Sequence, residues 1–343
     1  MIDLRSDTVT KPTYAMRQAM AVAEVGDDVY REDQTVIELE ETAAEILGKE
    51  AGLFVTSGTQ GNQVAILTHT KRGQEVIVEA DSHVFYYEVG AMAALAGLQT
   101  RPIAGMHGMM PLDEIAKAIR PENIHFPQTG LICLENTHNR SGGTILPLSY
   151  MQSVKELAVQ HHLPVHLDGA RLFNAVAATG ISAAAYAATA DSIQICLSKG
   201  LGAPIGSVLV GSRTFIEQAR KWRKMLGGGM RQAGVIAAPG LIALTQMRDR
   251  LVEDHVRAKH LAKGLANIRG ITVDVERVET NIVIADVSDS GLSTEEFLTV
   301  LEQCGVLATA FGGSLIRFVT HLDVTDDQID DAIAAVAFAT RMR

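Results

Sequence analysis

Short apolar runs alternate with stretches of helical periodicity along most of the chain. The runs, each bounded by residues that favour turns, predict buried strands at residues 53–55, 76–78, 131–134, 165–168, 193–198 and 206–210. Between them apolar positions recur at helical spacing, as in the helix predicted over residues 149–161. This alternation predicts an α/β fold, with a mostly parallel sheet covered by helices on both faces.

The N-terminal part precedes this alternation. Residues 1–11 are polar and β-branched, which favours an extended arm, and Pro12 then opens a helix. Asp33 is placed to cap the next helix, which Gly48 ends.

After the three glycines at residues 227–229 the pattern changes. It predicts a long helical stretch over residues 232–265, strands at 271–275, 281–285 and 316–319, and helices at 294–303 and 326–339. We therefore predict two domains: an N-terminal arm with a large domain over residues 1–245, and a small C-terminal α/β domain over residues 246–343.

Four residues with useful chemistry follow predicted strands. Gly58, His83, Asp168 and Lys199 each stand at or just after the end of one. Because ligands of such sheets bind at the carboxyl ends of the strands, these residues are expected to converge at one edge.

Lys199 and Asp168 define the chemistry expected at that edge. A single lysine in a glycine-containing turn is more often a surface residue, but a desolvated lysine amine is also a good nucleophile toward an aldehyde. Asp168 ends an apolar strand upstream. Because a pyridoxal site needs a carboxylate on its ring nitrogen, the pair favours a pyridoxal phosphate Schiff base on Lys199.

The other candidates have ordinary alternatives as well as functional ones. Gly58 and Thr59 begin a helix, where backbone N–H groups either are simply capped or bind a phosphate. His83 is either a buried histidine or a group stacked on a pyridoxal ring, and His125 is equally balanced between structure and substrate contact. Arg171 and Arg317 suit either an internal salt bridge or the carboxylate of an amino-acid substrate.

Composition narrows the function classes. The chain has 343 residues, 47% of them hydrophobic, and a net charge of −10, which argues against nucleic acid and anionic membrane surfaces as partners. The three cysteines show no metal spacing, which fits a reducing cytoplasm. Residues 1–7 lack the features of a signal peptide and no apolar run has the length of a membrane span, so we expect a cytoplasmic protein.

Six motifs occur in order along the chain: residues 4–10 (Leu-Arg-Ser-Asp-Thr-Val-Thr), 135–139 (Glu-Asn-Thr-His-Asn), 166–171 (His-Leu-Asp-Gly-Ala-Arg), 197–202 (Leu-Ser-Lys-Gly-Leu-Gly), 227–232 (Gly-Gly-Gly-Met-Arg-Gln) and 319–323 (Val-Thr-His-Leu-Asp). This ordered set resembles low-specificity L-threonine aldolase. The resemblance implies the aspartate-aminotransferase-like fold of type I, pyridoxal 5′-phosphate as cofactor, and a homotetramer built as a dimer of dimers with shared active sites.

The resemblance also implies roles for individual residues. Lys199 would carry the cofactor, Asp168 would bind its pyridine nitrogen, Gly58 and Thr59 its phosphate, and His83 would stack on its ring. A second group of residues is implied around the substrate and the subunit boundary. Arg231 and Tyr30 would reach the phosphate from the neighbouring subunit. The substrate carboxylate would be bound by Ser6, Arg171 and Arg317, with Arg171 also near the cofactor, and the β-substituent would be faced by His125, His83 and Tyr87. Some relatives bind a cation near Thr8, Thr10 and Ser198, and we treat this site as optional.

The implied reaction is the reversible cleavage of L-threonine and L-allo-threonine to glycine and acetaldehyde. Alternatives are action on other β-hydroxy amino acids such as phenylserine, a β-eliminating lyase or aminotransferase, and a non-catalytic protein of the same fold.

Overall fold

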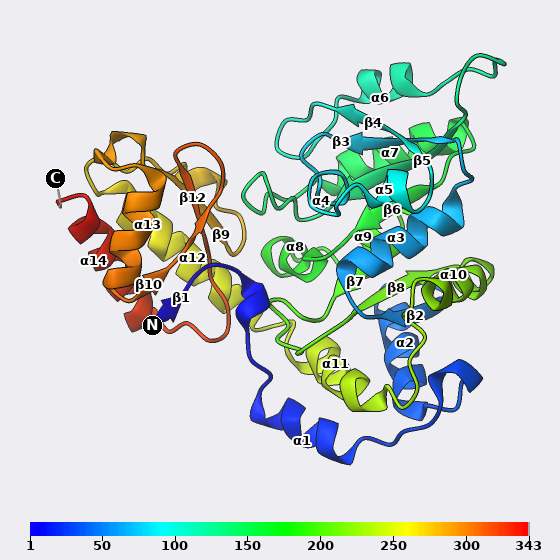
Figure 1. Ribbon diagram of the computed structural model, residues 1–343, viewed down its shortest axis with the longest axis horizontal. Helices are drawn as coiled ribbons and strands as arrows, with labels where there is room; N and C mark the ends of the chain where they lie inside the picture. The colour runs from blue at the N-terminus through cyan, green and yellow to red at the C-terminus, as the bar shows by residue number, and fades with distance from the viewer. Residues whose placement is uncertain (342–343) are drawn as a thin grey trace.

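The predicted sheet is present in the computed structural model, which describes residues 1–341. Its seven strands lie in the order β2–β8–β7–β6–β5–β3–β4 (Figure 1). The five strands from β7 to β4 run parallel, whereas β8 is antiparallel to both β7 and β2. The strands are β2 (Ala51–Val55), β3 (Glu75–Glu79), β4 (Gln99–Ile103), β5 (Thr129–Glu135), β6 (Val165–Asp168), β7 (Ser192–Cys196) and β8 (Ser207–Gly211).

Helices cover both faces of this sheet because successive strand residues point to opposite sides. Ile132 and Leu134 pack in one layer, and Leu131 and Cys133 in the other. The first layer contains α1 (Tyr14–Val22), α2 (Gln34–Ile46), α6 (Leu112–Ala118), α7 (Leu148–Gln160), α8 (Leu172–Thr179), α9 (Ala183–Ala187) and α11 (Gly234–Gln246). The second contains α3 (Gly58–His69), α4 (His83–Tyr86), α5 (Ala91–Ala94) and α10 (Arg213–Met225).

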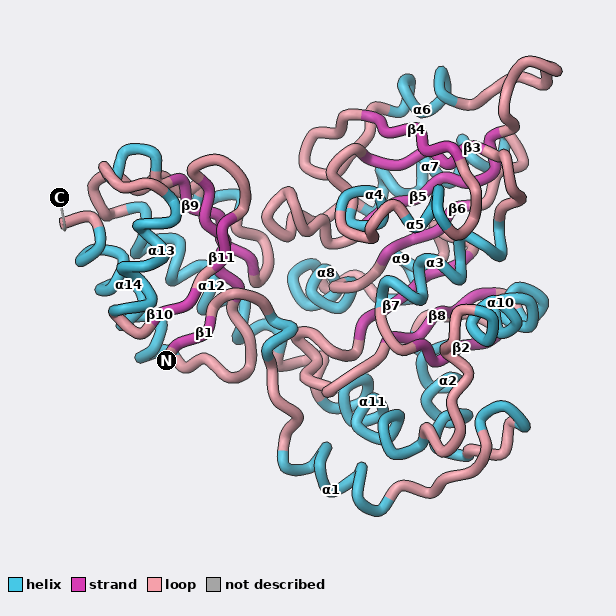
Figure 2. The backbone as a smooth tube through the Cα atoms, in the orientation of Figure 1, coloured by secondary structure: helices cyan, strands magenta, loops and turns pink. Residues whose placement is uncertain are grey.

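A second core forms in the C-terminal part of the chain (Figure 2). A three-stranded antiparallel sheet has the order β11–β12–β9 and packs with three helices. These elements are β9 (Ile282–Asp286), β11 (Thr309–Ala310), β12 (Leu315–Val319), α12 (Leu251–Ala266), α13 (Thr294–Gln303) and α14 (Asp326–Ala339). Short 3-10 turns lie at Asp7–Val9, Asp28–Tyr30, Val275–Arg277 and Ser288–Ser290.

The N-terminal arm connects the two cores. Strand β1 (Ile2–Asp3) pairs in parallel with β10 (Val306–Leu307), and Leu4 is fully buried among C-terminal residues. The prediction grouped the arm with the large domain, but its first residues pack with the small one, because their backbone pairing and the burial of Leu4 occur there. The arm then crosses toward α1 (Figure 1). The division of the chain at residue 246 stays a prediction.

Several predicted boundaries are confirmed. Helices α13 and α14 have the expected bounds, and each begins with a capping box, formed by Ser293 and Glu296 in α13. Asp33 caps α2, since its side chain accepts a hydrogen bond from the N–H of Val36. No helix in residues 1–341 combines the length and apolar character needed to cross a membrane.

Three predicted elements differ from the structure. The first helix begins at Tyr14 rather than Pro12, because the Thr13 side chain caps it. The stretch over residues 232–265 is divided into α11 and α12. The strand predicted at 271–275 is wrong: Thr272 forms only an isolated bridge with Asp286. Val273 and Val275 pack on the C-terminal core, so burial rather than strand pairing explains that apolar pattern.

Candidate active site

An open cavity of about 300 Å³ lies between the carboxyl edge of the large sheet and the small domain. The arm, α4, the loop after β7 and the β11–β12 hairpin all contribute to it. Most of its lining consists of residues singled out from the sequence: Ser6, Thr8, His83, Tyr87, Arg171, Lys199 and Arg317. Asn139, Thr309, Ala310 and Phe311 complete the lining.

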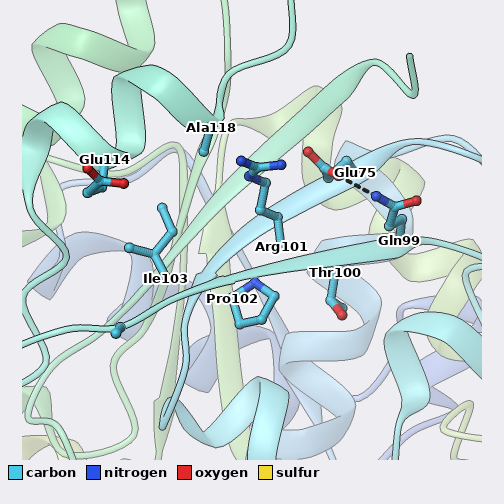
Figure 3. Close-up of a pocket in the computed structure, with 9 residues that line it drawn as sticks. Glu75, Gln99, Thr100, Arg101, Pro102, Ile103, Glu114 and Ala118 are labelled. Carbon is cyan, nitrogen blue, oxygen red and sulfur yellow. Dashed lines mark hydrogen bonds between the residues drawn. The ribbon is translucent and has the colours of Figure 1, made fainter. Parts of the chain in front are cut away.

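A separate groove runs along the edge strand β4 (Figure 3). Arg101 and Ile103 project from this strand toward α6, and Glu75 accepts a hydrogen bond from Gln99. The Glu75 carboxylate is also paired with Arg120. None of the predicted site residues lines this groove, so we place the chemistry in the cavity beside Lys199.

Lys199 follows β7 in a short turn and lines the cavity. Its backbone carbonyl accepts a hydrogen bond from the Thr10 hydroxyl at 3.1 Å, which ties the arm to this turn. Within residues 1–341 its amine has no hydrogen bond or ion pair at distances typical of such contacts. The amine is therefore available to a ligand. Thr8 and Thr10 both lie near Lys199, and a cation at Thr8, Thr10 and Ser198 stays a prediction.

Asp168 is the last residue of β6 and is almost completely buried. One carboxylate oxygen accepts from Asn62 at 2.8 Å, and the other accepts from Gln194 at 2.9 Å and from the N–H of Ala170 at 3.0 Å. Burial opposes ionisation, but the charges of His83 and Lys199 and the hydrogen bonds from Asn62 and Gln194 outweigh it and lower the pKa of Asp168. Asp168 is thus a buried, ionised acceptor.

His83 opens the short helix α4 and faces the same cavity. Its Nδ1 lies 3.0 Å from a carboxylate oxygen of Glu88, whose side chain is fully buried. Burial works against the charged imidazole, but the hydrogen bond to Glu88 and the charges of Asp168, Glu88 and Glu135 raise the pKa of His83. Because Glu88 occupies Nδ1, Nε2 is the nitrogen available for a ligand.

The two predicted carboxylate-binding arginines differ in their partners. Arg171 is buried and donates two hydrogen bonds to Asp7, at 2.7 and 2.6 Å. Arg171 therefore forms the internal salt bridge that was one of its two predicted roles, and it also lines the cavity. Burial opposes the ionised carboxylate, but the charge and hydrogen bonds of Arg171, the charge of Lys199 and a hydrogen bond from Asn281 lower the pKa of Asp7 to about 2.

Arg317 has only neutral partners among the described residues. It donates to the Asn139 side chain at 2.8 Å and to the carbonyl of Arg5 at 3.2 Å, and its buried Nε has no partner there. Desolvation, together with the charge of Arg171, lowers the pKa of Arg317. A partly buried guanidinium without a carboxylate, at the wall of a cavity, is suited to bind an anion.

Gly58 and Thr59 form the first turn of α3, above the end of β7. A side chain at Gly58 would place its Cβ 2.8 Å from Cys196 Sγ, so only glycine permits this close packing. Ser57 Oγ caps the turn by accepting from the Gln60 N–H. The remaining first-turn N–H groups form a natural position for a phosphate.

Three of the predicted residues that do not line the cavity are exposed on the surface of this chain. His125 lies in an exposed turn between α6 and β5. Tyr30 is 73% exposed, and Arg231 is exposed and pairs loosely with Asp27 at 3.4 Å. The Arg231 carbonyl accepts from the N–H of Asp28, so the segments that carry Tyr30 and Arg231 are joined on one surface.

Sequence reasoning missed several residues that build the site. Glu88, Asn62 and Asp7 hold His83, Asp168 and Arg171 through the contacts described above. Asp7 lies inside a recognised motif, and Asn62 lies two positions after the Gly58–Gln60 turn, but neither had a partner that could be inferred from spacing. Glu88 offers one signal, a carboxylate directly after the aromatic run at residues 85–87.

Fold and cavity together define a type I pyridoxal-phosphate enzyme: a lysine and a buried carboxylate at the carboxyl edge of a mostly parallel sheet, beside a small α/β domain. Comparison with known proteins narrows this class. The family model for beta-eliminating lyase matches residues 3–290. The chain is 46% identical over 335 residues to low specificity L-threonine aldolase of Escherichia coli, covering 97% of this chain and 98% of the relative.

A plant relative gives the same result. Low-specificity L-threonine aldolase 1 of Arabidopsis thaliana is 47% identical over 333 residues, covering 96% of this chain and 93% of the relative. The structure of Leishmania major threonine aldolase superposes with a TM-score of 0.84 at 18% identity, covering 99% of this chain and 100% of that one, and supports the fold.

The chain belongs to the beta-eliminating lyase family and, within it, to the low-specificity L-threonine aldolases. The predicted fold class and cofactor are thereby confirmed.

Proposed function

We propose that this enzyme catalyses the reversible cleavage of L-threonine and L-allo-threonine to glycine and acetaldehyde. The family membership supports an aldolase that acts on a β-hydroxy amino acid. The observation that carries the substrate class is Arg317: its partly buried guanidinium lines the same cavity as Lys199 and has only neutral partners within residues 1–341. An amino-acid carboxylate would supply the missing anion.

The residues present fit pyridoxal 5′-phosphate. Lys199 would hold it covalently, the buried and ionised Asp168 would accept from its ring nitrogen, and the α3 turn at Gly58 and Thr59 would bind its phosphate. His83 lies at the wall of the cavity, where it would cover one face of the ring. When bound, the cofactor supplies an electron sink for the negative charge that develops at the substrate Cα.

The substrate would be held by its carboxylate. Arg317 would supply donors to it, and Ser6 and Arg171, whose guanidinium has further N–H groups beyond the two that Asp7 binds, line the same cavity. Asp7 fixes Arg171 from behind through two hydrogen bonds, so its guanidinium is held in one orientation. His83 and Tyr87 line the same cavity, where they would face the β-substituent of a substrate held by its carboxylate.

His83 is our candidate to accept the β-hydroxyl proton. Glu88 binds its Nδ1, which fixes the ring and leaves Nε2 as the acceptor. The resemblance places His125 near the β-hydroxyl too, and since His125 is exposed outside the cavity of its own chain, that role would require it to reach the site of another subunit.

The assembly we propose is a cytoplasmic homotetramer, a dimer of dimers with shared active sites. Tyr30 and Arg231 support it because both are exposed on one joined surface, away from the cavity of their own chain. In such an assembly they would reach the phosphate position of a neighbouring subunit. We do not expect nucleic acid or membrane partners.

The decisive experiment incubates the purified, cofactor-loaded enzyme with each threonine diastereomer and measures acetaldehyde and glycine. Equal amounts of the two products are expected, with their loss in Lys199→Ala. Formation of 2-oxobutyrate instead would show a β-eliminating lyase, and turnover of phenylserine alone would show a different β-hydroxy amino-acid substrate. No product from any of them would refute the proposal.

A further inference from the structure

A buried amide joins the two carboxylates beneath the cavity. Asn62, on α3, is 1% exposed, and its Nδ2 lies 2.8 Å from an oxygen of Glu88 and 2.8 Å from an oxygen of Asp168. Glu88 holds His83, and Asp168 is the acceptor proposed for the cofactor ring nitrogen. The Asn62 side chain therefore contacts both Asp168 itself and Glu88, the residue that binds His83.

The chemistry of the two carboxylates fixes the orientation of this amide. Ionised carboxylates only accept hydrogen bonds, so both N–H groups of Asn62 point toward them and its Oδ1 points away. The atom beyond Oδ1 is His166 Nε2, at 3.0 Å. Because Oδ1 can only accept, Nε2 carries the proton and donates it to this bond.

The same reasoning extends outward through two more residues. His166 Nδ1 lies 2.8 Å from Ser192 Oγ, and as the unprotonated nitrogen of a neutral ring it accepts the serine hydroxyl proton. Ser192 Oγ then accepts from His69 Nε2 at 2.7 Å. In every step the residue farther from Asp168 is the donor: His69 donates to Ser192, Ser192 to His166, His166 to Asn62, and Asn62 to Glu88 and Asp168. We call these four residues the donor chain.

The fold explains why the donor chain is complete. Asn62 and His69 are seven residues apart on α3, which is close to two helical turns, so they lie on one face of that helix. His166 and Ser192 are paired neighbours on the parallel strands β6 and β7, beneath α3. The donor chain therefore starts on α3 at His69, crosses the strand pair at Ser192 and His166, and returns to α3 at Asn62.

Both histidines must be neutral for these directions to hold. Burial lowers the pKa of His166 to about 4, and burial together with the charge of His166 lowers the pKa of His69 to about 3. Neither ring is charged near neutral pH, so each keeps one donor and one acceptor nitrogen.

We propose that Asn62, His166, Ser192 and His69 are positioning residues that hold Asp168 ionised and correctly oriented, and thereby keep the proton on the ring nitrogen of the bound cofactor. A reversed Asn62 amide would point its oxygen at two carboxylates and remove the hydrogen bond that each of them accepts from Asn62, and the bond from His166 prevents this reversal. This inference rests on the proposed function, because it requires the cofactor at Lys199 and Asp168.

The test loads each variant with pyridoxal phosphate labelled with ¹⁵N at the ring nitrogen. Two quantities are measured: the ¹⁵N chemical shift, which reports ring protonation, and the dissociation constant of the cofactor. The variants are Asn62→Ala, His166→Phe and Ser192→Ala, each of which removes one link. The control is Thr189→Val, which removes a buried hydroxyl that donates to the Tyr186 carbonyl outside the cavity lining.

The donor chain predicts a graded result. Asn62→Ala should weaken cofactor binding about tenfold or more, since hydrogen bonds to charged groups are strong, and it should shift the ¹⁵N signal toward the unprotonated ring. His166→Phe should give a smaller change of the same sign, and Ser192→Ala the smallest. Thr189→Val should lose thermal stability without a change of the ¹⁵N signal.

Two results would overturn the inference. One is a wild-type ¹⁵N signal in folded Asn62→Ala and His166→Phe, and the other is an equal ¹⁵N change in Thr189→Val. If Asn62→Ala and His166→Phe do not fold, Ser192→Ala decides, because it removes only one hydroxyl at the outer part of the donor chain. Failure of the wild-type enzyme to bind the cofactor at Lys199 would instead refute the proposed function.

Discussion

The Asp7–Arg171 pair offers a quantitative test of how the arm supports the site. Replacing Asp7 by Asn keeps the shape of the side chain but removes the charge that faces the buried Arg171 guanidinium. The pKa of Asp7 falls from 3.8 to about 2 on folding, and at about 1.4 kcal/mol for each pKa unit its ionisation contributes on the order of 2–3 kcal/mol to stability. A buried arginine left without its anion commonly lowers the free energy of unfolding by about 3–5 kcal/mol, so we expect Asp7→Asn to lower it by about 3 kcal/mol.

The sign of the pH dependence follows from the lowered pKa. A carboxyl group with a lower pKa in the folded state stabilises the fold above its unfolded pKa, and this contribution is lost as pH falls toward the folded value. The difference in unfolding free energy between wild type and Asp7→Asn should therefore be constant above about pH 5 and shrink below pH 4, toward the folded pKa of about 2.

The assay is guanidinium unfolding of the cofactor-free protein at fixed concentration. Far-UV circular dichroism follows the whole fold, and fluorescence of the single tryptophan, Trp222 on α10, follows the large domain. The double variant Asp7→Asn/Arg171→Met should recover part of the loss, because it removes the unpaired charge. The control Asp113→Asn, in a surface pair with Lys117, should show no measurable loss. The reasoning would be refuted if Asp7→Asn lowered the free energy of unfolding by less than about 1 kcal/mol. It would also be refuted if the effects of Asp7→Asn and Arg171→Met simply added in the double variant.

The remaining predictions concern ligand binding. Arg317→Ala should raise KM for the amino acid about tenfold or more and leave cofactor affinity nearly unchanged, because Arg317 has no anionic partner in the described part of the chain; an equal loss of both affinities would indicate a structural role. Glu88→Gln should move the acid limb of the pH profile of kcat/KM to lower pH, because it removes a charge that raises the pKa of His83; an unmoved limb would exclude His83 as the base. Arg231→Ala should weaken cofactor retention in the intact oligomer, whereas Arg277→Ala, another exposed arginine paired with an aspartate, should not. Normal retention in Arg231→Ala would argue against a shared site.

The convergence at the sheet edge shows what strand patterning can predict. His83, Asp168 and Lys199 were placed at one edge because each follows an apolar run, and His83 and Lys199 line one cavity, with Asp168 buried close enough to both for their charges to lower its pKa. This inference succeeds because parallel strands with short connections bring their carboxyl ends together whatever the details of packing.

The partners of those residues could not be inferred in the same way. Asp7 and Arg171 are 164 residues apart and pair only because the arm returns across the large domain. Asn62 contacts Glu88 on one side and Asp168 on the other, across separations of 26 and 106 residues. Nothing in local spacing distinguishes these side chains from surface residues of the same type.

The sequence by itself determined the class of fold, the cofactor and the positions of Lys199 and Asp168, because periodicity and turn residues act over short distances. Only the tertiary structure decided that Arg171 is paired while Arg317 lacks a carboxylate among the residues that the structure describes, that the first residues of the arm pack with the small domain, and that a line of buried donors ends on Asp168. The physical reason is that burial and pairing depend on which distant segments come into contact, and a hydrogen bond over a few ångströms leaves no periodic signal along the chain.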